Sequence, residues 1–335
     1  MRQDELATVD LANYRLGDNL AAALGEALKM RRALADGAAA IMPGRCVCVC
    51  VCVSVFGLGG GQCPCALRAR WLAQWNDRAL AHRHHPVEGL LLQNNLLKEP
   101  PNTRMDERGE RNGTEAVCYV IHSNKAHLTT IDLSLNMIGS NGGILLSSAI
   151  TGNVVLQSLK LHGCGLRDKG IAVLSETLKE CSAVSYLDFS KNGLGPGAAV
   201  HLNGLIEFSV RLKEFYLGWN DLRRGGELIL RNLKRNDSGL HTLSLPWNGM
   251  RDDDGGAVEF ALHHAAQLRV LDISNNEIRE RAAMVIAGAL KRTMTLDRLV
   301  MRNNPIGVRG GNAMFKLMRC VTRDSNSRYQ PGCFV

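Results

Sequence analysis

The chain has 335 residues, enough for two ordinary domains or for one elongated array that adds a unit at a time. Aromatic residues make up only 5% of it, which disfavours a nucleic-acid platform, where basic side chains alternate with aromatics that stack on the bases. The net charge of +8 is unevenly placed, because residues 279–328 hold eleven basic side chains against three acidic ones. This basic end predicts an acidic surface on a partner, with a solvated basic face as the alternative.

Neither the start of the chain nor its cysteines suggest secretion. Residues 1–18, MRQDELATVDLANYRLGD, are polar and charged and lack the apolar core of a signal peptide. The longest apolar run, residues 47–58, is too short to cross a bilayer. Six of the eleven cysteines crowd residues 46–65 and the others are scattered, so no secreted disulfide framework is visible. We therefore expect a cytoplasmic protein with reduced thiols and no membrane contact.

An apolar phrase of eleven residues recurs seven times with a period of 28 residues. Each copy, such as LTTIDLSLNMI or LRVLDISNNEI, is apolar at positions 1, 4, 6 and 11 and alternates like a short strand. Seven consecutive matches predict a repeat architecture in which each unit leans on the next. The phrases open at Leu128, Leu156, Val184, Leu212, Leu240, Leu268 and Leu296.

Position 9 of the phrase is asparagine in six of the seven copies. The chain must turn there, and the turn leaves backbone N–H and C=O groups that a buried interior would strand unpaired. An amide side chain both donates and accepts, so one amide per unit can satisfy these groups as a ladder. A cysteine in this slot fills the space with weaker hydrogen bonding. The predicted ladder consists of Asn136, Cys164, Asn192, Asn220, Asn248, Asn276 and Asn304.

The second half of each unit follows a helical pattern. A glycine precedes apolar residues spaced by one, three and four, as in Leu145, Leu146, Ala149 and Ile150. Parallel strands lie about 4.8 Å apart whereas helices need about 10 Å, so a stack of such units must curve. The sequence therefore predicts an α/β leucine-rich solenoid, a horseshoe with a parallel sheet on its concave face and helices on its convex face. The helix-opening glycines are Gly142, Gly170, Gly197, Gly226, Gly255 and Gly310.

The phrase, its helical second half and the occasional cysteine in the asparagine slot resemble the ribonuclease-inhibitor subfamily of leucine-rich repeats. That subfamily also supplies the sensor ends of NOD-like receptors, the Ran GTPase-activating proteins and several ciliary subunits. The resemblance is strong over residues 128–320 and looser over residues 6–34 and 87–127. It implies the solenoid fold and the binding of another macromolecule, and it transfers no functional residue.

The regular pattern is interrupted near its start. Leu6, Val9 and Leu11 fit the strand phrase of a first unit, with Tyr14 in the asparagine slot, but the phrase that should follow resumes only at Val87. The predicted organisation is a first unit at residues 1–34, an inserted low-complexity segment at 35–86, an irregular unit at 87–127, seven regular units at 128–320 and a C-terminal tail at 321–335.

The inserted segment contains CVCVCVCV at residues 46–53. Alternating Cys and Val is what a TG dinucleotide repeat encodes, so the segment is either a translated microsatellite or intron, or a genuine apolar segment prone to β-aggregation. Peptides recovered from residues 46–70 of the native protein would defeat the first interpretation. In the irregular unit, the polar stretch 98–114 is expected to be a loop.

Three groups of side chains could carry chemistry, and each has a simpler structural explanation. Cys63 and Cys65 could bind zinc with the histidines at 82, 84 and 85, but the spacing is poor and the group lies in or beside the insert. The glycines at 193, 195 and 197 mimic a phosphate-binding turn without the lysine of a P-loop. The aspartates at 252–254 precede a helix, whose dipole they complement. We therefore expect no catalytic residue, metal, cofactor, small-molecule ligand or nucleic acid.

The concave face is the predicted binding surface. Equivalent positions of two adjacent units hold Trp219 and Trp247, about 5 Å apart along the sheet, with Tyr216 and Tyr186 close by. Exposed aromatics in a chain so poor in them are typical of interaction hot spots. Alternatively, both indoles fold over the loops and pack locally. The predicted partner-binding residues are Tyr186, Tyr216, Trp219, Trp247, Arg298 and Arg302.

The leading functional prediction is a non-catalytic intracellular scaffold or sensor module that grips another protein. A GTPase-activating protein of the Ran-activator type is the enzyme-regulatory alternative, although those proteins end in an acidic tail and this chain ends in the basic CVTRDSNSRYQPGCFV. A ciliary or cytoskeletal structural subunit is the third prediction.

Overall fold

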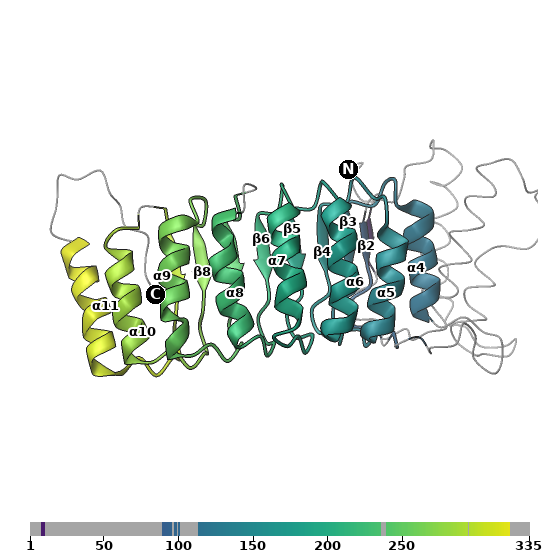
Figure 1. Cartoon of the computed structure of the whole chain (residues 1–335). Helices are drawn as coiled ribbons and strands as arrows, with labels where there is room; N and C mark the ends of the chain where they lie inside the picture. Colours follow the sequence, from purple (N-terminus) through teal and green to yellow (C-terminus); the bar gives the residue numbers. More distant parts are fainter. Residues whose placement is uncertain are drawn as a thin grey trace, which may run out of the picture.

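A computed structural model describes residues 8–10, 89–95, 97, 98, 100, 113–235, 239–293 and 295–321. These residues form one nine-stranded sheet in which every neighbouring pair of strands is parallel and the strands follow the order of the chain (Figure 1). The strands are β1 (Thr8–Asp10), β2 (Gly89–Leu91), β3 (Thr130–Asp132), β4 (Ser158–Lys160), β5 (Tyr186–Asp188), β6 (Glu214–Tyr216), β7 (Thr242–Ser244), β8 (Val270–Asp272) and β9 (Arg298–Val300).

The sheet keeps one register through regular and irregular units alike. From β3 onward the paired residues are 28 apart, as in Thr130 with Ser158. Thr8 pairs with Gly89, and Gly89 pairs with Thr130, so the two irregular intervals in the sequence leave the alignment of the strands unchanged. The observed register thus confirms the stack of parallel strands that the 28-residue period predicts. The inserted segment 35–86 and the tail from residue 322 lie outside the described residues.

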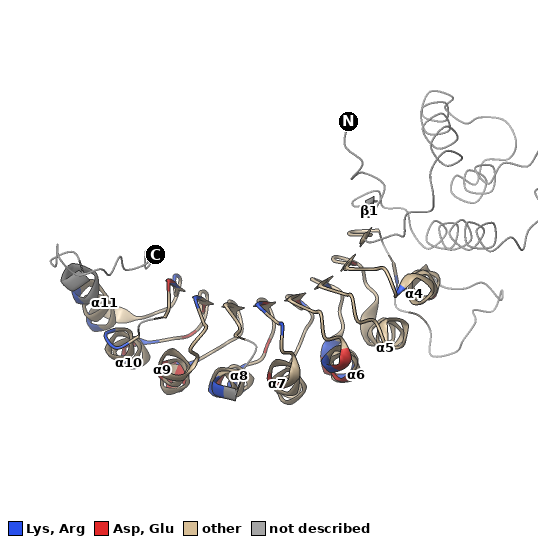
Figure 2. Ribbon diagram, turned by 90° about the horizontal axis from the view of Figure 1, so that it is seen from above, with Lys and Arg blue, Asp and Glu red and all other residues tan. Residues whose placement is uncertain are grey.

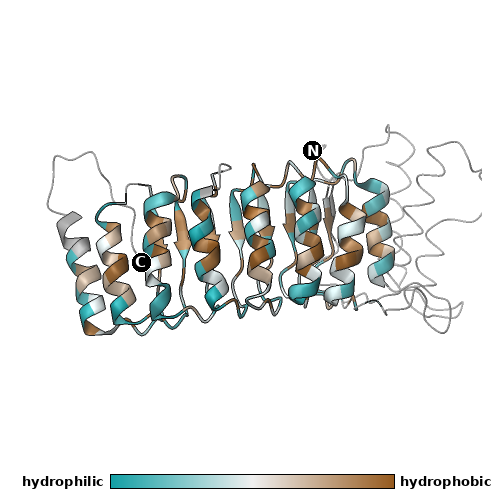
Figure 3. Cartoon of the chain, in the orientation of Figure 1, coloured by the Kyte–Doolittle hydropathy of each residue, from teal (hydrophilic) through white to brown (hydrophobic). Residues whose placement is uncertain are grey.

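Helices cover one face of this sheet. Seen from above, the strands line the inner side of an arc and the helices its outer side, which confirms the predicted horseshoe (Figure 2). The helices carry both hydrophobic and hydrophilic stripes (Figure 3), as expected where one side packs and the other meets water. They are α4 (Gly113–Asn124), α5 (Gly139–Ile150), α6 (Arg167–Glu180), α7 (Ala198–Phe208), α8 (Arg224–Asn232), α9 (Gly255–His264), α10 (Glu280–Leu290) and α11 (Gly307–Val321).

The core runs the length of the solenoid between strands and helices. The middle residue of each regular strand points inward and is at most 3% exposed, and burial of one such side chain contributes about 1.5–3 kcal/mol. Two neighbouring units fill this layer with Phe189 and Phe215, whose rings meet edge to face at 5.8 Å. The inward row consists of Ile131, Leu159, Leu187, Phe215, Leu243, Leu271 and Leu299.

Two expectations about helix starts were wrong. The stretch 98–114 is expected to be a loop, but α4 begins at Gly113, so the last two residues are helical, while residues 99 and 101–112 lie outside the described residues. Gly142, Gly170 and Gly310 lie inside the first turn of their helices rather than before it. The reason is packing between units, since a Cβ on Gly170 would come within 3.1 Å of the Ser140 Cα.

None of the helices in the described part of the chain combines the length and apolar character needed to cross a membrane.

Candidate binding surface

The asparagine at the ladder position forms hydrogen bonds both with the turn of the preceding unit and with the turn of its own unit. The Asn276 amide shows the full pattern, because its Oδ1 accepts the N–H groups of Asn248 at 2.9 Å and Met250 at 3.1 Å. Its Nδ2 donates to the carbonyls of Leu245 at 3.0 Å and Ile273 at 2.9 Å. Asn136, Asn192, Asn220, Asn248 and Asn304 make equivalent bonds with the turns beside them.

Cys164 occupies the ladder position of one unit and makes weaker hydrogen bonds there than an asparagine does. Its thiol donates to the Leu133 carbonyl at 3.2 Å, but sulfur replaces the amide oxygen that accepts two N–H groups elsewhere. The Asn136 N–H therefore meets the Cys164 sulfur, a weaker acceptor than the amide oxygen that equivalent N–H groups find in other units. Burial raises the pKa of this thiol well above its usual range, so Cys164 stays protonated and able to donate.

The residue just before the ladder position adopts a left-handed backbone in every unit from β2 to β9. Such a conformation costs little for Gly or Asn and about 1–2 kcal/mol for other residues. Sequence reasoning did not detect it, although the recurrence of Asn and Gly in this slot was a usable signal. The residues, all with φ between 53° and 66°, are Asn94, Leu135, Gly163, Lys191, Trp219, Trp247, Asn275 and Asn303.

Two tryptophans occupy this strained slot in adjacent units. The indole rings of Trp219 and Trp247 stack with centroids 4.6 Å apart and an interplanar angle of 20°. They remain 55% and 46% exposed, so the rings pack on each other and still present a large apolar surface to water. Bulky residues at positive φ are uncommon, and where they occur the surrounding structure must hold them in place.

A second aromatic pair lies on the strands of the same region. Tyr186 on β5 and Tyr216 on β6 have ring centroids 5.2 Å apart. The Tyr216 hydroxyl donates to the Glu214 carboxylate at 2.8 Å, and the Lys160 Nζ lies 5.4 Å from the centre of the Tyr186 ring. Burial, with Asp188 and then Glu214 nearby, raises the pKa of Tyr186 to about 12.

The two arginines of the predicted site stand apart from these aromatics. Arg298 on β9 and Arg302 in the following turn are exposed, and neither makes an ion pair with a described residue. Strand β9 is two strands beyond β7, or about 10 Å at the usual strand spacing, and three strands beyond β6. The structure thus gathers four of the predicted residues into three consecutive units and places the arginines at the end of the sheet.

The other groups considered for chemistry have structural roles or lie outside the described residues. Asp252 Oδ1 accepts the Ala282 N–H at 2.8 Å, and Asp254 accepts the Arg251 N–H at 2.6 Å. The N–H of Gly195 donates to an Asp168 carboxylate at 2.7 Å, so this turn already holds an anion of the chain. No cluster suited to a metal ion occurs within the described residues, and Cys63 and Cys65 lie outside them.

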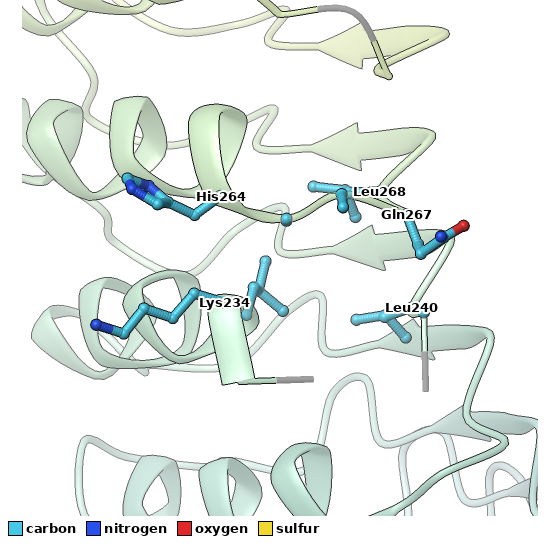
Figure 4. Close-up of a pocket in the computed structure, with 9 residues that line it drawn as sticks. Lys234, Leu240, His264, Gln267 and Leu268 are labelled. Carbon is cyan, nitrogen blue, oxygen red and sulfur yellow. The ribbon is translucent and has the colours of Figure 1, made fainter. Parts of the chain in front are cut away.

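A shallow pocket opens between the units of α8 and α9 (Figure 4). Lys234 and His264 flank it, and Gln267 lies at its other end beside Leu240 and Leu268. Its lining brings no set of convergent polar groups around a ligand position, so it does not change the choice of the concave face.

The comparisons with known proteins agree with this architecture. A family model described as "Leucine Rich repeat" matches residues 124–147. The ribonuclease inhibitor of Mus musculus is 27% identical over 197 residues, covering 58% of this chain and 43% of the inhibitor. The leucine-rich repeat-containing protein 73 of Homo sapiens is 29% identical over 185 residues, covering 53% and 58%. The Ran GTPase-activating protein 1 of Saccharomyces cerevisiae is 24% identical over 241 residues, covering 64% and 59%.

The uniform sheet register gives the chain a leucine-rich-repeat solenoid fold, and the matches show that its units are similar to those of ribonuclease inhibitor. The chain spans less than two thirds of the length of each of these relatives.

Proposed function

We propose that this chain is a non-catalytic module that binds another protein on its concave face, through Tyr186, Tyr216, Trp219 and Trp247. The stacked, half-exposed tryptophan pair carries the proposal. A chain has no structural need for two indoles at a left-handed turn position that Asn275 and Asn303 fill in the two following units. Backbone strain kept in this way points to a functional use.

The energy available from this pair suits a binding hot spot. A tryptophan offers about 200 Å² of surface, of which about half is still exposed here, so burying the rest yields about 2–3 kcal/mol for each ring. Hot spots of protein interfaces have this composition and this magnitude. Two neighbouring rings can therefore supply a large share of the affinity of one interface.

The last unit extends the proposed surface. Arg298 and Arg302 are exposed on the same side of the array and would meet an acidic patch of the partner. We place the complex in the cytoplasm, because the free thiols of Cys118, Cys164 and Cys181 suit a reducing compartment. Among the relatives, one is named for inhibiting a ribonuclease and one for activating the Ran GTPase, and both names describe action on another protein.

Affinity capture with matched variants tests the proposal. Trp219→Ala with Trp247→Ala removes the concave rings, while Phe208→Ala with Val210→Ala removes two side chains of similar exposure at the end of α7. We expect the first variant to lose the proteins that the unaltered chain captures and the second to retain them. Unchanged capture by a tryptophan variant with unaltered thermal unfolding would refute the proposal.

The enzyme-regulatory alternative rests on the alignment with the yeast Ran GTPase-activating protein, which covers 64% of this chain. A GTP hydrolysis assay with a panel of small G proteins separates the two. A non-catalytic module leaves the hydrolysis rate unchanged, whereas GTPase activators raise such rates by about 10³–10⁵-fold. Acceleration of that size would replace the proposed function by the alternative.

A further inference from the structure

Acidic side chains flank both tyrosines of the concave face. The register of β5 and β6 places Tyr186 directly beside Glu214, and Asp188 directly beside Tyr216. Further along the same row of outward positions, Ser244 separates Tyr216 from Asp272. Each tyrosine thus has a carboxylate at the strand spacing of about 4.8 Å.

Asp188 and Asp272 each have one carboxylate oxygen that makes no hydrogen bond within the described residues. Asp188 and Asp272 each use Oδ1 to accept the N–H two residues further on, at 2.9 Å in both cases. Their Oδ2 atoms have no hydrogen-bond partner among the described residues, and neither carboxylate forms an ion pair there. Asp132, the acidic residue at the corresponding position of β3, is only 1% exposed and bonds Gln93, so it is not available.

One lysine of the chain already lies against an aromatic ring of this surface. Lys160 on β4 holds its Nζ over the Tyr186 ring at 5.4 Å, and the register places this residue directly beside Asp188, with which it forms no close ion pair. An aromatic face attracts a cation by about 0.5–2 kcal/mol, and a nearby carboxylate adds to that attraction. The strands β4 to β8 carry three half-buried carboxylates against this one lysine at their outward positions, and the adjoining loops carry Lys191, Arg211, Lys213 and Arg269.

We propose that the concave face from β5 to β8 receives a basic segment of the protein partner, whose Lys or Arg side chains lie among Tyr186, Tyr216, Asp188 and Glu214. The inference rests on the proposed function and specifies the chemistry of its partner. It runs opposite to the expectation from the net charge of the chain, which the exposed basic residues of the last units dominate.

The proposed partner therefore carries both a basic segment and an acidic patch. Glu214 on β6 and Arg298 on β9 occupy the same row three strands apart, which is about 14 Å at the usual spacing. A partner with a basic segment and an acidic patch at that separation fits in one direction only, because the reversed orientation opposes like charges. The charge pattern sets the orientation, and the tryptophans supply apolar contact in either case.

Titration calorimetry of the full chain with two synthetic peptides tests the inference. One peptide alternates Arg and Ser and the other alternates Glu and Ser. We expect the Arg–Ser peptide to bind more tightly, and binding to weaken as salt is added. Asp188→Asn with Glu214→Gln keeps the shape and hydrogen-bonding oxygens and removes only charge, so it should weaken Arg–Ser binding at least tenfold. Glu176→Gln, which removes an exposed carboxylate from the convex helix α6, is the control and should leave that affinity unchanged.

Three results would overturn the inference: equal binding of the two peptides, no binding of the Arg–Ser peptide, or an unaltered affinity in the doubly neutralised variant. The outcome is separable from that of the proposed function. If the tryptophan variant loses its captured partners while the neutralised variant keeps them, the concave site stands and the basic segment is wrong. If both variants keep them, both proposals fail.

Discussion

Two neighbouring positions of the same turn behave in opposite ways along the solenoid. The ladder position holds an asparagine in all but one regular unit and is buried in five of the seven, with Asn248 0% exposed and Asn220 and Asn304 half-buried. The position before it is half-exposed or exposed in most units and varies from Leu to Lys, Trp and Asn, with Trp247 46% exposed. The comparison teaches that in this repeat the constant position maintains the stack, and the variable one is free to specify a partner.

The largest effect is expected from breaking the ladder. Asn276→Ala removes an amide that accepts two backbone N–H groups and donates to two carbonyls, all buried among packed turns. Because unsatisfied buried groups cost about 1–3 kcal/mol, the free energy of unfolding should fall by about 3 kcal/mol. Urea unfolding followed by circular dichroism measures the loss.

Asn275→Ala, one residue earlier, is the matched control for that experiment. Asn275 has a left-handed backbone with φ 54° and is only half-buried, so its replacement should cost about 1 kcal/mol. Equal losses from the two alanine variants would contradict the distinction between the positions.

Restoring the ladder should have a smaller effect of opposite sign. Cys164→Asn replaces the weak sulfur acceptor of the Asn136 N–H by an amide oxygen, which is the acceptor that the equivalent N–H groups find in other units. We expect the free energy of unfolding to rise by about 1 kcal/mol. A destabilised Cys164→Asn variant in the same urea experiment would show that the slot is shaped for sulfur.

The smallest effect on stability is expected at the variable position. Trp219→Asn with Trp247→Asn gives up a ring stack of about 0.5–1.5 kcal/mol and the buried half of each ring, and it relieves two left-handed backbones of about 1–2 kcal/mol each, so the losses and gains largely offset. The thermal midpoint should shift by only a few degrees while partner binding is lost. A loss of stability comparable with that of Asn276→Ala would mean that the rings serve the fold.

The fold was predictable because a 28-residue period specifies which residues are neighbours. The recurrence of Leu128 every 28 residues located the strands. The recurrence of Asn136 located the turns whose backbone groups the amide side chains bond. The start of α4 was not predictable, since the 13 extra residues of its unit obscure the period. The carboxylates beside the tyrosines could have been found, because Tyr186 and Glu214 are 28 residues apart and must lie on adjacent strands.

What the sequence could not supply is the conformation of the exposed side chains. Whether Trp219 stacks on Trp247 or folds over its own loop depends on rotamers and on a left-handed turn, neither of which a repeat pattern encodes. The repeat pattern reflects the contacts between neighbouring units of the chain. It therefore carries no information about a partner that binds from outside.

Site-specific photo-cross-linking tests the central claim most directly. A photoreactive phenylalanine in place of Trp247 on the concave side, or of Phe208 on the convex side, reports which surface a bound protein covers. The account predicts a covalent adduct with the captured protein from position 247 and none from position 208. An adduct from position 208 alone would contradict it.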